Sequence, residues 1–160
     1  MKELLTFRFA TVLSILVGLS ALKADQQVEA DSDREKLRDV PRWENFVERN
    51  DRIYDPESNQ PYTGHVALRY GNEGLALGHC RAGMLDGTST SWYPDGTTRS
   101  EHTYRQGLLE GLSTTWYRNG QKISQGHYRK GKLHGIWISW DSRGNETEQH
   151  NYRNGVRNSN

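Results

Sequence analysis

The chain has 160 residues, a length that suits one domain and excludes a second large catalytic domain beside it. Only 33% of the residues are hydrophobic, so we expect aromatic side chains, rather than a deep aliphatic core, to provide most of the apolar burial. The net charge is +1, and the basic residues beyond residue 60 are scattered along the chain. Because nucleic-acid binding normally requires a clustered basic patch, we expect no nucleic-acid partner.

Residues 1–24 predict a signal peptide or an N-terminal anchor. Lys2 and Arg8 precede an uncharged stretch, residues 9–22, which is shorter than the ~20 apolar residues of a membrane-spanning helix. Cleavage after Ser20 or Ala24 would not follow a clean small-x-small pattern, so both a cleaved and an uncleaved leader stay open. We therefore expect a secreted or periplasmic protein of the cell envelope.

Residues 25–42 predict a polar linker, and residues 43–160 predict one repeat domain. The linker is rich in charged side chains that have little to bury, and Pro41 interrupts any helix. Short alternating runs follow, and a first hairpin is expected around Asn50 and Asp51.

Glycine and aromatic residues recur at an interval of 24 residues, most clearly over residues 83–155. The recurring positions, which we expect to be structural, are Gly87, Gly111 and Gly135; Gly96, Gly120 and Gly144; Trp92, Trp116 and Trp140; and Tyr104, Tyr128 and Tyr152. A fixed period of this length is typical of repeat arrays, whose units bury their apolar faces against their neighbours. A weaker unit precedes the clear ones, so we expect about four repeats.

Each repeat is predicted to be a β-hairpin, which makes the domain all-β. In the unit 111–135, two alternating runs flank Asn119 and Gly120. An Asn-Gly dipeptide favours a tight hairpin turn because both residues tolerate positive φ. A second turn is predicted at residues 129–132, where the chain reverses again toward the next unit.

Alternation along the strands predicts which aromatic residues share a face of the sheet. Trp116 is expected on one face, whereas Tyr117 and Trp137 are expected on the other. Equivalent residues of neighbouring repeats lie two strands apart, roughly 9.5 Å, so the recurring tryptophans should form a column. Tyr104 and Tyr128, on the intervening strands, are expected to fill the gaps in that column.

The motifs of one unit identify a family resemblance. Residues 116–120 read Trp-Tyr-Arg-Asn-Gly, and residues 128–135 begin with Tyr and carry glycine at Gly131 and Gly135. These motifs resemble the MORN repeat, in the variant common in bacterial proteins, and the resemblance extends over residues 46–155. It implies an elongated, single-layer antiparallel β-meander of repeated hairpins. It also implies a scaffold for protein contacts or for attachment near membranes, and one bacterial subfamily of similar arrays is classed as antitoxin components.

The histidines are not spaced as metal ligands in such an array. His79 and His127 are 48 residues apart, as are His102 and His150, so each pair spans two repeats. Four strands correspond to roughly 19 Å, whereas two imidazoles that share an ion each lie about 2 Å from it. We expect no metal site.

The remaining reactive residues do not form a catalytic set either. Asp86 and Glu110 share their repeat position with His134, which we interpret as a solvated turn position. Cys80 is the single cysteine, which excludes an intramolecular disulfide, and it stands where other repeats carry tyrosine. We interpret it as a small buried hydrophobe. We expect neither enzymatic activity nor a cofactor.

The leading functional hypothesis is a non-catalytic protein–protein interaction or scaffold module exported from the cytoplasm. Tyr93, Tyr117 and Trp137 are the predicted partner-binding residues, and the protein partner is unknown. An alternative is an antitoxin or immunity-type protein that neutralises a toxin. A third hypothesis is peripheral membrane attachment through the leader or through weakly basic turns such as residues 129–132.

Overall fold

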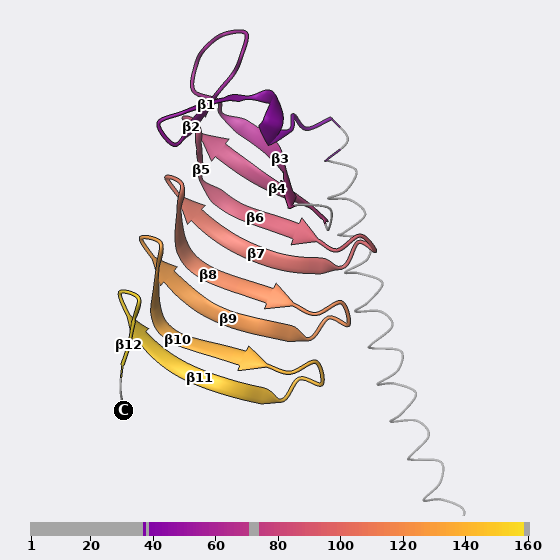
Figure 1. The fold of residues 1–160 in the computed structure, drawn as a ribbon, viewed down its shortest axis with the longest axis vertical. Helices are drawn as coiled ribbons and strands as arrows, with labels where there is room; N and C mark the ends of the chain where they lie inside the picture. The colour runs from indigo at the N-terminus through magenta and orange to yellow at the C-terminus, as the bar shows by residue number, and fades with distance from the viewer. Residues whose placement is uncertain (1–36, 38, 71–73, 159–160) are drawn as a thin grey trace, which may run out of the picture.

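A computed structural model describes residue 37 and residues 39–70 and 74–158. The predicted leader, residues 1–24, and most of the predicted linker, residues 25–42, lie outside the described residues. The described part forms one ten-stranded antiparallel sheet and a separate two-stranded hairpin (Figure 1). Among these residues, no helix is long and apolar enough to cross a membrane.

The large sheet is a meander in which each long strand lies beside the one before it. Its order is β12-β11-β10-β9-β8-β7-β6-β4-β3, and the short β5 pairs with β4. The strands are β3 (Gly64–Tyr70), β4 (Gly74–Arg81), β5 (Met84–Leu85), β6 (Gly87–Trp92), β7 (Thr98–Arg105), β8 (Leu108–Trp116), β9 (Lys122–Arg129), β10 (Lys132–Trp140), β11 (Glu146–Arg153) and β12 (Val156–Arg157). The predicted antiparallel array of hairpins is confirmed.

Two kinds of turn alternate along the meander. At the turn between β9 and β10, Lys130 and Gly131 both have positive φ, which defines the two-residue turn that matches strand twist. At the turn between β8 and β9, only Gly120 has positive φ, and its N–H donates to the Tyr117 carbonyl. Asn119 does not adopt the positive φ that its pairing with Gly120 suggested. The Tyr117 N–H donates to the Gln121 carbonyl at 2.8 Å, so the loop comprises three residues, 118–120, instead of two.

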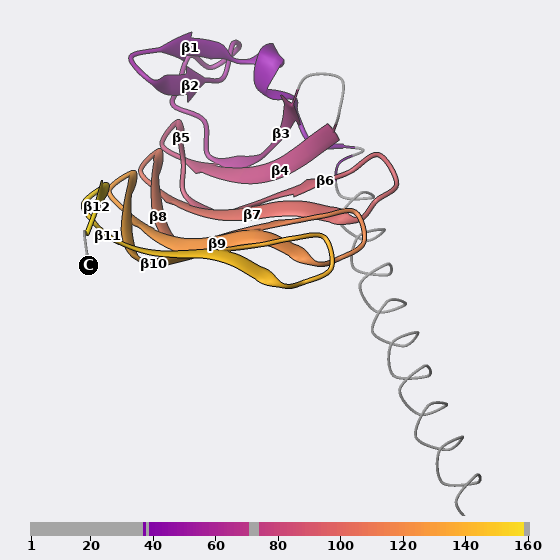
Figure 2. The same cartoon turned by 60° about the horizontal axis from the view of Figure 1, so that its bottom comes forward.

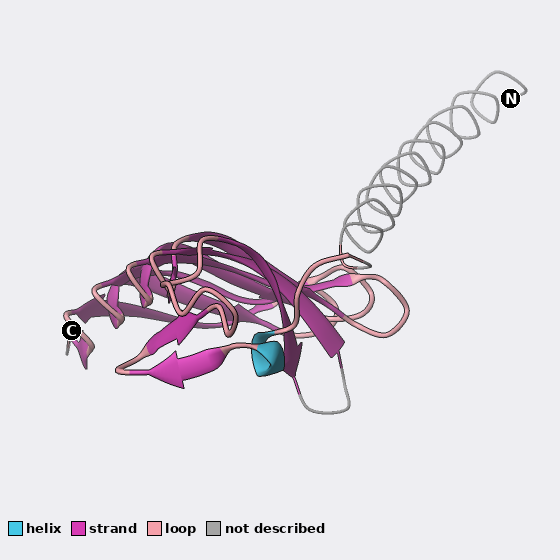
Figure 3. Ribbon diagram, turned by 90° about the horizontal axis from the view of Figure 1, so that it is seen from above, coloured by secondary structure: helices cyan, strands magenta, loops and turns pink. Residues whose placement is uncertain are grey.

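Irregularities in pairing recur with the repeat and bend the sheet. The register between β8 and β9 passes from Thr115↔Ser124 to Trp116↔Lys122, so it skips Ile123. The equivalent steps skip Arg99 in β7 and Thr147 in β11. Such bulges bend a strand and increase its twist. The sheet is accordingly an arch rather than a flat plate (Figure 3).

The N-terminal hairpin covers the inside of this arch at its first strands. It comprises β1 (Val47–Arg49) and β2 (Arg52–Tyr54) and follows a short 3-10 helix, η1 (Trp43–Asn45). Figures 2 and 3 show these elements against β3 and β4, on the hollow side of the sheet. The expected hairpin at Asn50 and Asp51 is confirmed, but it does not extend the sheet. It forms a second layer that the single-layer prediction did not include.

The buried core lies between this hairpin and the sheet. Ile53 of β2, Val66 of β3 and Cys80 of β4 are fully buried against one another. We call the face that carries Val66 and Cys80 the concave face, and the opposite one the convex face. Across the register, the concave face continues from Val66 through Ser91 and Ser100 to Trp137 in β10.

Candidate binding surface

The two predicted binding tyrosines connect consecutive repeats. The Tyr93 hydroxyl donates to the Trp116 carbonyl at 2.7 Å, and the Tyr117 hydroxyl donates to the Trp140 carbonyl at 3.2 Å. Each tyrosine follows the last residue of its strand and reaches the strand end of the next hairpin. Both therefore stabilise the stacking of repeats, and their half-buried rings leave part of each side chain accessible.

Trp137 lies across the concave face of the neighbouring strand. It is paired with Gly126, and a Cβ atom at Gly126 would collide with the Trp137 ring. The ring meets Tyr128 edge to face, with centroids 6.3 Å apart, and its Nε1 donates to Ser139 Oγ at 3.2 Å. Gly126 thus provides the space that the indole occupies. The result is a half-buried aromatic surface on the concave face.

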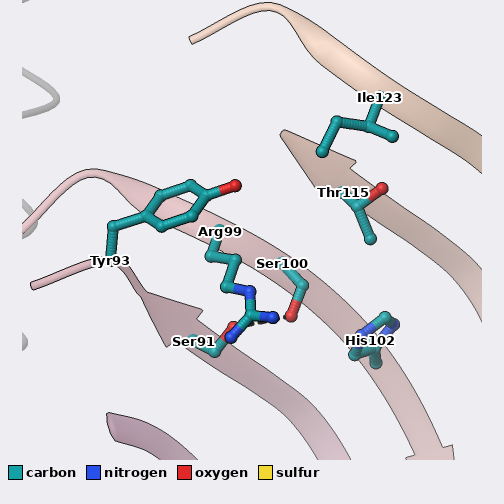
Figure 4. Close-up of a pocket in the computed structure, with 7 residues that line it drawn as sticks. All are labelled: Ser91, Tyr93, Arg99, Ser100, His102, Thr115 and Ile123. Carbon is teal, nitrogen blue, oxygen red and sulfur yellow. Dashed lines mark hydrogen bonds between the residues drawn. The ribbon is translucent and has the colours of Figure 1, made fainter. Parts of the chain in front are cut away.

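A cavity of about 490 Å³ opens on the same face, beside Tyr93. It is lined by Ser91, Tyr93, Arg99, Ser100, His102, Thr115 and Ile123 (Figure 4). These side chains come from four neighbouring strands and from the turn after β6. Arg99 and Ile123 are the residues skipped by the register, so the bulges help to direct them into this space.

Some polar groups of the cavity have hydrogen-bond partners, whereas the Arg99 guanidinium has no carboxylate partner among the described residues. Ser91 Oγ and Ser100 Oγ are hydrogen-bonded at 2.7 Å, and His102 Nδ1 is 2.8 Å from Ser113 Oγ. Burial lowers the pKa of His102 below its ordinary value of 6.5, which favours a neutral ring at pH 7. The Arg99 guanidinium is 5.9 Å from the centre of the Tyr93 ring. Within the described part of the chain, it makes no ion pair with a carboxylate.

The recurring tryptophans and tyrosines occupy opposite faces. Trp116 is paired with Lys122 on the convex face, whereas Tyr128 is paired with Gly111 and belongs to the concave face beside Trp137. The prediction that Tyr104 and Tyr128 fill the tryptophan column is therefore wrong. The gap next to Trp140 is occupied instead by Lys122, whose Nζ is 5.6 Å from the centre of a Trp140 ring.

The predicted structural glycines occupy two kinds of backbone position. Gly87, Gly111 and Gly135 have positive φ where a long strand turns sharply between two paired segments. Gly96, Gly120 and Gly144 close the three-residue turns, and each N–H donates to a carbonyl three residues before it. Their positive φ favours glycine at each of these positions.

The acidic residues before the recurring glycines are anchors between repeats. Glu110 Oε2 accepts a hydrogen bond from the Lys130 N–H at 2.6 Å, and Asp86 Oδ2 accepts one from the Gln106 N–H at 3.3 Å. These carboxylates are half-buried, so the interpretation of a solvated turn position is wrong. His134 occupies the same position in the next repeat, and its Nδ1 is buried without a partner among the described residues.

The structure brings together a pair of histidines other than the two pairs that lie 48 residues apart. His65 and His79 are directly paired across β3 and β4, with ring centroids 5.2 Å apart. His79 Nδ1 also lies 3.3 Å from the Asp86 carbonyl. Over residues 39–70 and 74–158, however, no three histidine, cysteine or acidic residues gather as a metal site.

Cys80 is buried in the core, as its interpretation as a small hydrophobe predicted. Burial raises the pKa of its thiol to about 11, so the thiol stays protonated at neutral pH. It contributes to packing under the N-terminal hairpin.

Comparison with known families agrees with this geometry. The family model of the MORN repeat variant matches residues 85–106, which contain the hairpin β6–β7, and residues 109–130, which contain the hairpin β8–β9 except for Leu108. No curated protein matches the chain. Repeats of this family are generally non-enzymatic modules that bind proteins or membranes. The recurrent hairpins, their turns and the two matched stretches together identify repeats of the MORN type over residues 85–130.

Proposed function

We propose that the protein is a non-catalytic module that holds a protein partner on its concave face, outside the cytoplasm. The leader-like sequence of residues 1–24 supports the export part of this proposal.

One observation carries the choice of face. The N-terminal hairpin already packs a polypeptide segment against the concave face at β3 and β4, where Ile53 is buried against Val66 and Cys80. Further along the same face, Trp137 and the Tyr93 cavity present aromatic and polar groups that are only half-buried. A partner segment can therefore use the later repeats as the N-terminal hairpin uses the first ones.

The residues of this surface suit a protein partner. Aromatic side chains are enriched at the centre of protein interfaces because they bury a large area at little entropic cost. Trp137 offers such an anchor, and its ring is held in place by Tyr128 and Ser139. The surrounding hydroxyl groups provide hydrogen bonds that specify orientation.

The test compares two substitutions at adjacent residues of β10. Trp137→Ala removes the aromatic anchor from the concave face, whereas Ile136→Ser changes a convex-face residue that is 51% exposed. We expect Trp137→Ala to abolish affinity capture of a partner from the native cell envelope and Ile136→Ser to leave it unchanged. Loss of capture with Ile136→Ser alone would place the interface on the convex face, and equal capture by both variants would contradict the proposal.

The identity of the captured protein separates a scaffold from a neutralising protein. A toxin whose activity falls on binding would assign the antitoxin or immunity role, and an envelope component without such activity would assign the scaffold role. Cell fractionation of the full chain tests export, since recovery in the cytoplasm alone would contradict it.

A further inference from the structure

We propose that the cavity beside Tyr93 binds the C-terminal carboxylate of a partner polypeptide, with the Arg99 guanidinium as its anchor. This inference rests on the proposed protein-binding function and specifies the chemical group that the concave face recognises.

Arg99 carries an unbalanced positive charge. Its side chain lines the cavity and is half-buried, and among the described residues its one charge or ring interaction is the 5.9 Å approach to the Tyr93 ring. None of the described residues that line the cavity is acidic. Arginine presents a planar fork of N–H donors that fits a carboxylate through two parallel hydrogen bonds. The guanidinium N–H groups of Arg99 are therefore available to bind a carboxylate.

Neighbouring groups add donors at the same place. In the Ser91–Ser100 pair, one hydroxyl donates to the other, so the accepting hydroxyl keeps its own proton for a ligand. His102 lines the cavity as well, and its Nδ1 is engaged by Ser113 Oγ. The site thus combines one cation with neutral hydrogen-bonding groups.

This combination favours a carboxylate over a phosphate. Among the described residues of the lining, Arg99 is the one that carries a permanent positive charge. The nearby Arg118 lies over the Tyr93 ring, where its charge also acts on Asp95. A single guanidinium balances the one charge of a carboxylate. A phosphate group carries up to two charges and three strong acceptor oxygens, which require more cations or donors.

The size and the walls of the cavity suit a C-terminal residue. A volume of about 490 Å³ holds much more than a carboxylate, and the Tyr93 ring and Ile123 form apolar walls within it. A C-terminal residue carries its carboxylate and its side chain on one Cα atom, so it can contact Arg99 and these walls together. The rest of the partner chain can then continue over the open concave face.

Arg99 has no counterpart of the same charge in the other repeats. The bulge position holds Arg99 in one repeat, Ile123 in the next and Thr147 in the last. The turn and the bulge are preserved in all three, so the scaffold does not require an arginine. The cation is a property of this cavity rather than of the fold.

The experiment uses the full chain and two matched peptide pools. The pools are random hexapeptides with a fluorescent N-terminal label, one with free C-terminal carboxylates and the other with C-terminal amides. The immobilised protein selects peptides from each pool, and the dissociation constants of enriched sequences are then measured in both forms by fluorescence polarisation. We expect enrichment only from the free-acid pool and at least tenfold weaker binding after amidation.

Variants assign the effect to Arg99. Arg99→Gln should lose at least tenfold in affinity and should no longer discriminate between acid and amide, while Arg99→Lys should be intermediate. Arg105→Gln, at the exposed end of the same strand, is the matched control and should behave as the unmodified protein. Circular dichroism confirms that each variant is folded.

Several outcomes would overturn the inference. They are equal binding of acid and amide, continued discrimination by the folded Arg99→Gln variant, or no enriched peptide in the free-acid pool. A competition experiment with free 4-methylpentanoate completes the test. If this acid displaces the peptides with an affinity similar to theirs, the ligand is a small acid and not a chain terminus. Partner capture that depends on Trp137 but not on Arg99 would leave the proposed function standing while this inference fails.

Discussion

Because the Trp137 ring fills the space above Gly126, we expect Gly126→Ala to destabilise the natural chain but to stabilise a Trp137→Ala variant. The missing side chain at Gly126 provides the space for the Trp137 ring, and an alanine Cβ would lie only 3.3 Å from two further ring atoms. Gly126 does not have positive φ, so the backbone itself accepts alanine. The consequence of Gly126→Ala therefore depends on the indole.

The magnitude follows from three contributions. Overpacking costs about 1–3 kcal/mol, and loss of the edge contact with Tyr128 adds about 0.5–1.5 kcal/mol. Replacing glycine in a strand interior recovers roughly 0.5–1 kcal/mol of backbone entropy. We expect Gly126→Ala to lower the free energy of unfolding by about 1–3 kcal/mol in the natural chain. In a Trp137→Ala background, the same change should raise it by about 0.5–1 kcal/mol.

The assay is urea denaturation of the four proteins in this double-mutant cycle, followed by far-ultraviolet circular dichroism. The coupling energy between the two positions should exceed about 1.5 kcal/mol, well above the ~0.5 kcal/mol error of additivity. If Gly126→Ala has the same effect in both backgrounds, Trp137 does not occupy the space above Gly126, and the proposed binding surface loses its anchor.

Three further predictions concern buried polar groups. His134→Glu should raise the free energy of unfolding by about 0.5–1.5 kcal/mol, because a carboxylate there can accept a hydrogen bond from the Asn154 N–H, as Glu110 does from the Lys130 N–H. A lower urea midpoint would show that a glutamate at position 134 does not form this hydrogen bond. With a pKa of about 11 and a buried thiol, Cys80 should react with a disulfide reagent only after unfolding, so rapid reaction of the folded protein at pH 8 would contradict its burial. Because the pKa of His102 is lowered in the folded state, the unfolded chain binds the proton more readily, and stability should fall as the pH drops through about 6.5 and level off below the folded pKa. His102→Asn should flatten this part of the urea-midpoint profile, and an unchanged profile would assign the pH dependence to other groups.

Much of the architecture could be predicted because it is local. Lys130 and Gly131 are adjacent in the chain, and their positive φ values close a hairpin without reference to anything distant. The alternation that separated Trp137 from the tryptophan column is equally local, and the structure confirms it. The turn at Asn119 shows the limit of such reasoning, since the dipeptide indicated the turn but not its three-residue length.

The candidate site could be predicted only in part because register across strands decides it. Trp137 and Tyr117 could be assigned to a face, but the hydrogen bond from Tyr117 to the Trp140 carbonyl depends on how two repeats stack. Arg99 could have been suspected as a binding residue from one signal, namely that a single repeat carries a cation where its neighbours carry Ile123 and Thr147.

The sequence by itself determined the repeat, its all-β character and the opposed faces of its strands, because turn conformation and side-chain alternation act within a few residues. Only the tertiary structure decided that the N-terminal hairpin folds back over β3 and β4 to bury Cys80, that Gly126 receives Trp137, and that Arg99 enters a cavity. Each of these contacts joins residues on different strands. Their positions depend on the accumulated register, bulges and curvature of the sheet, which no short stretch of sequence specifies.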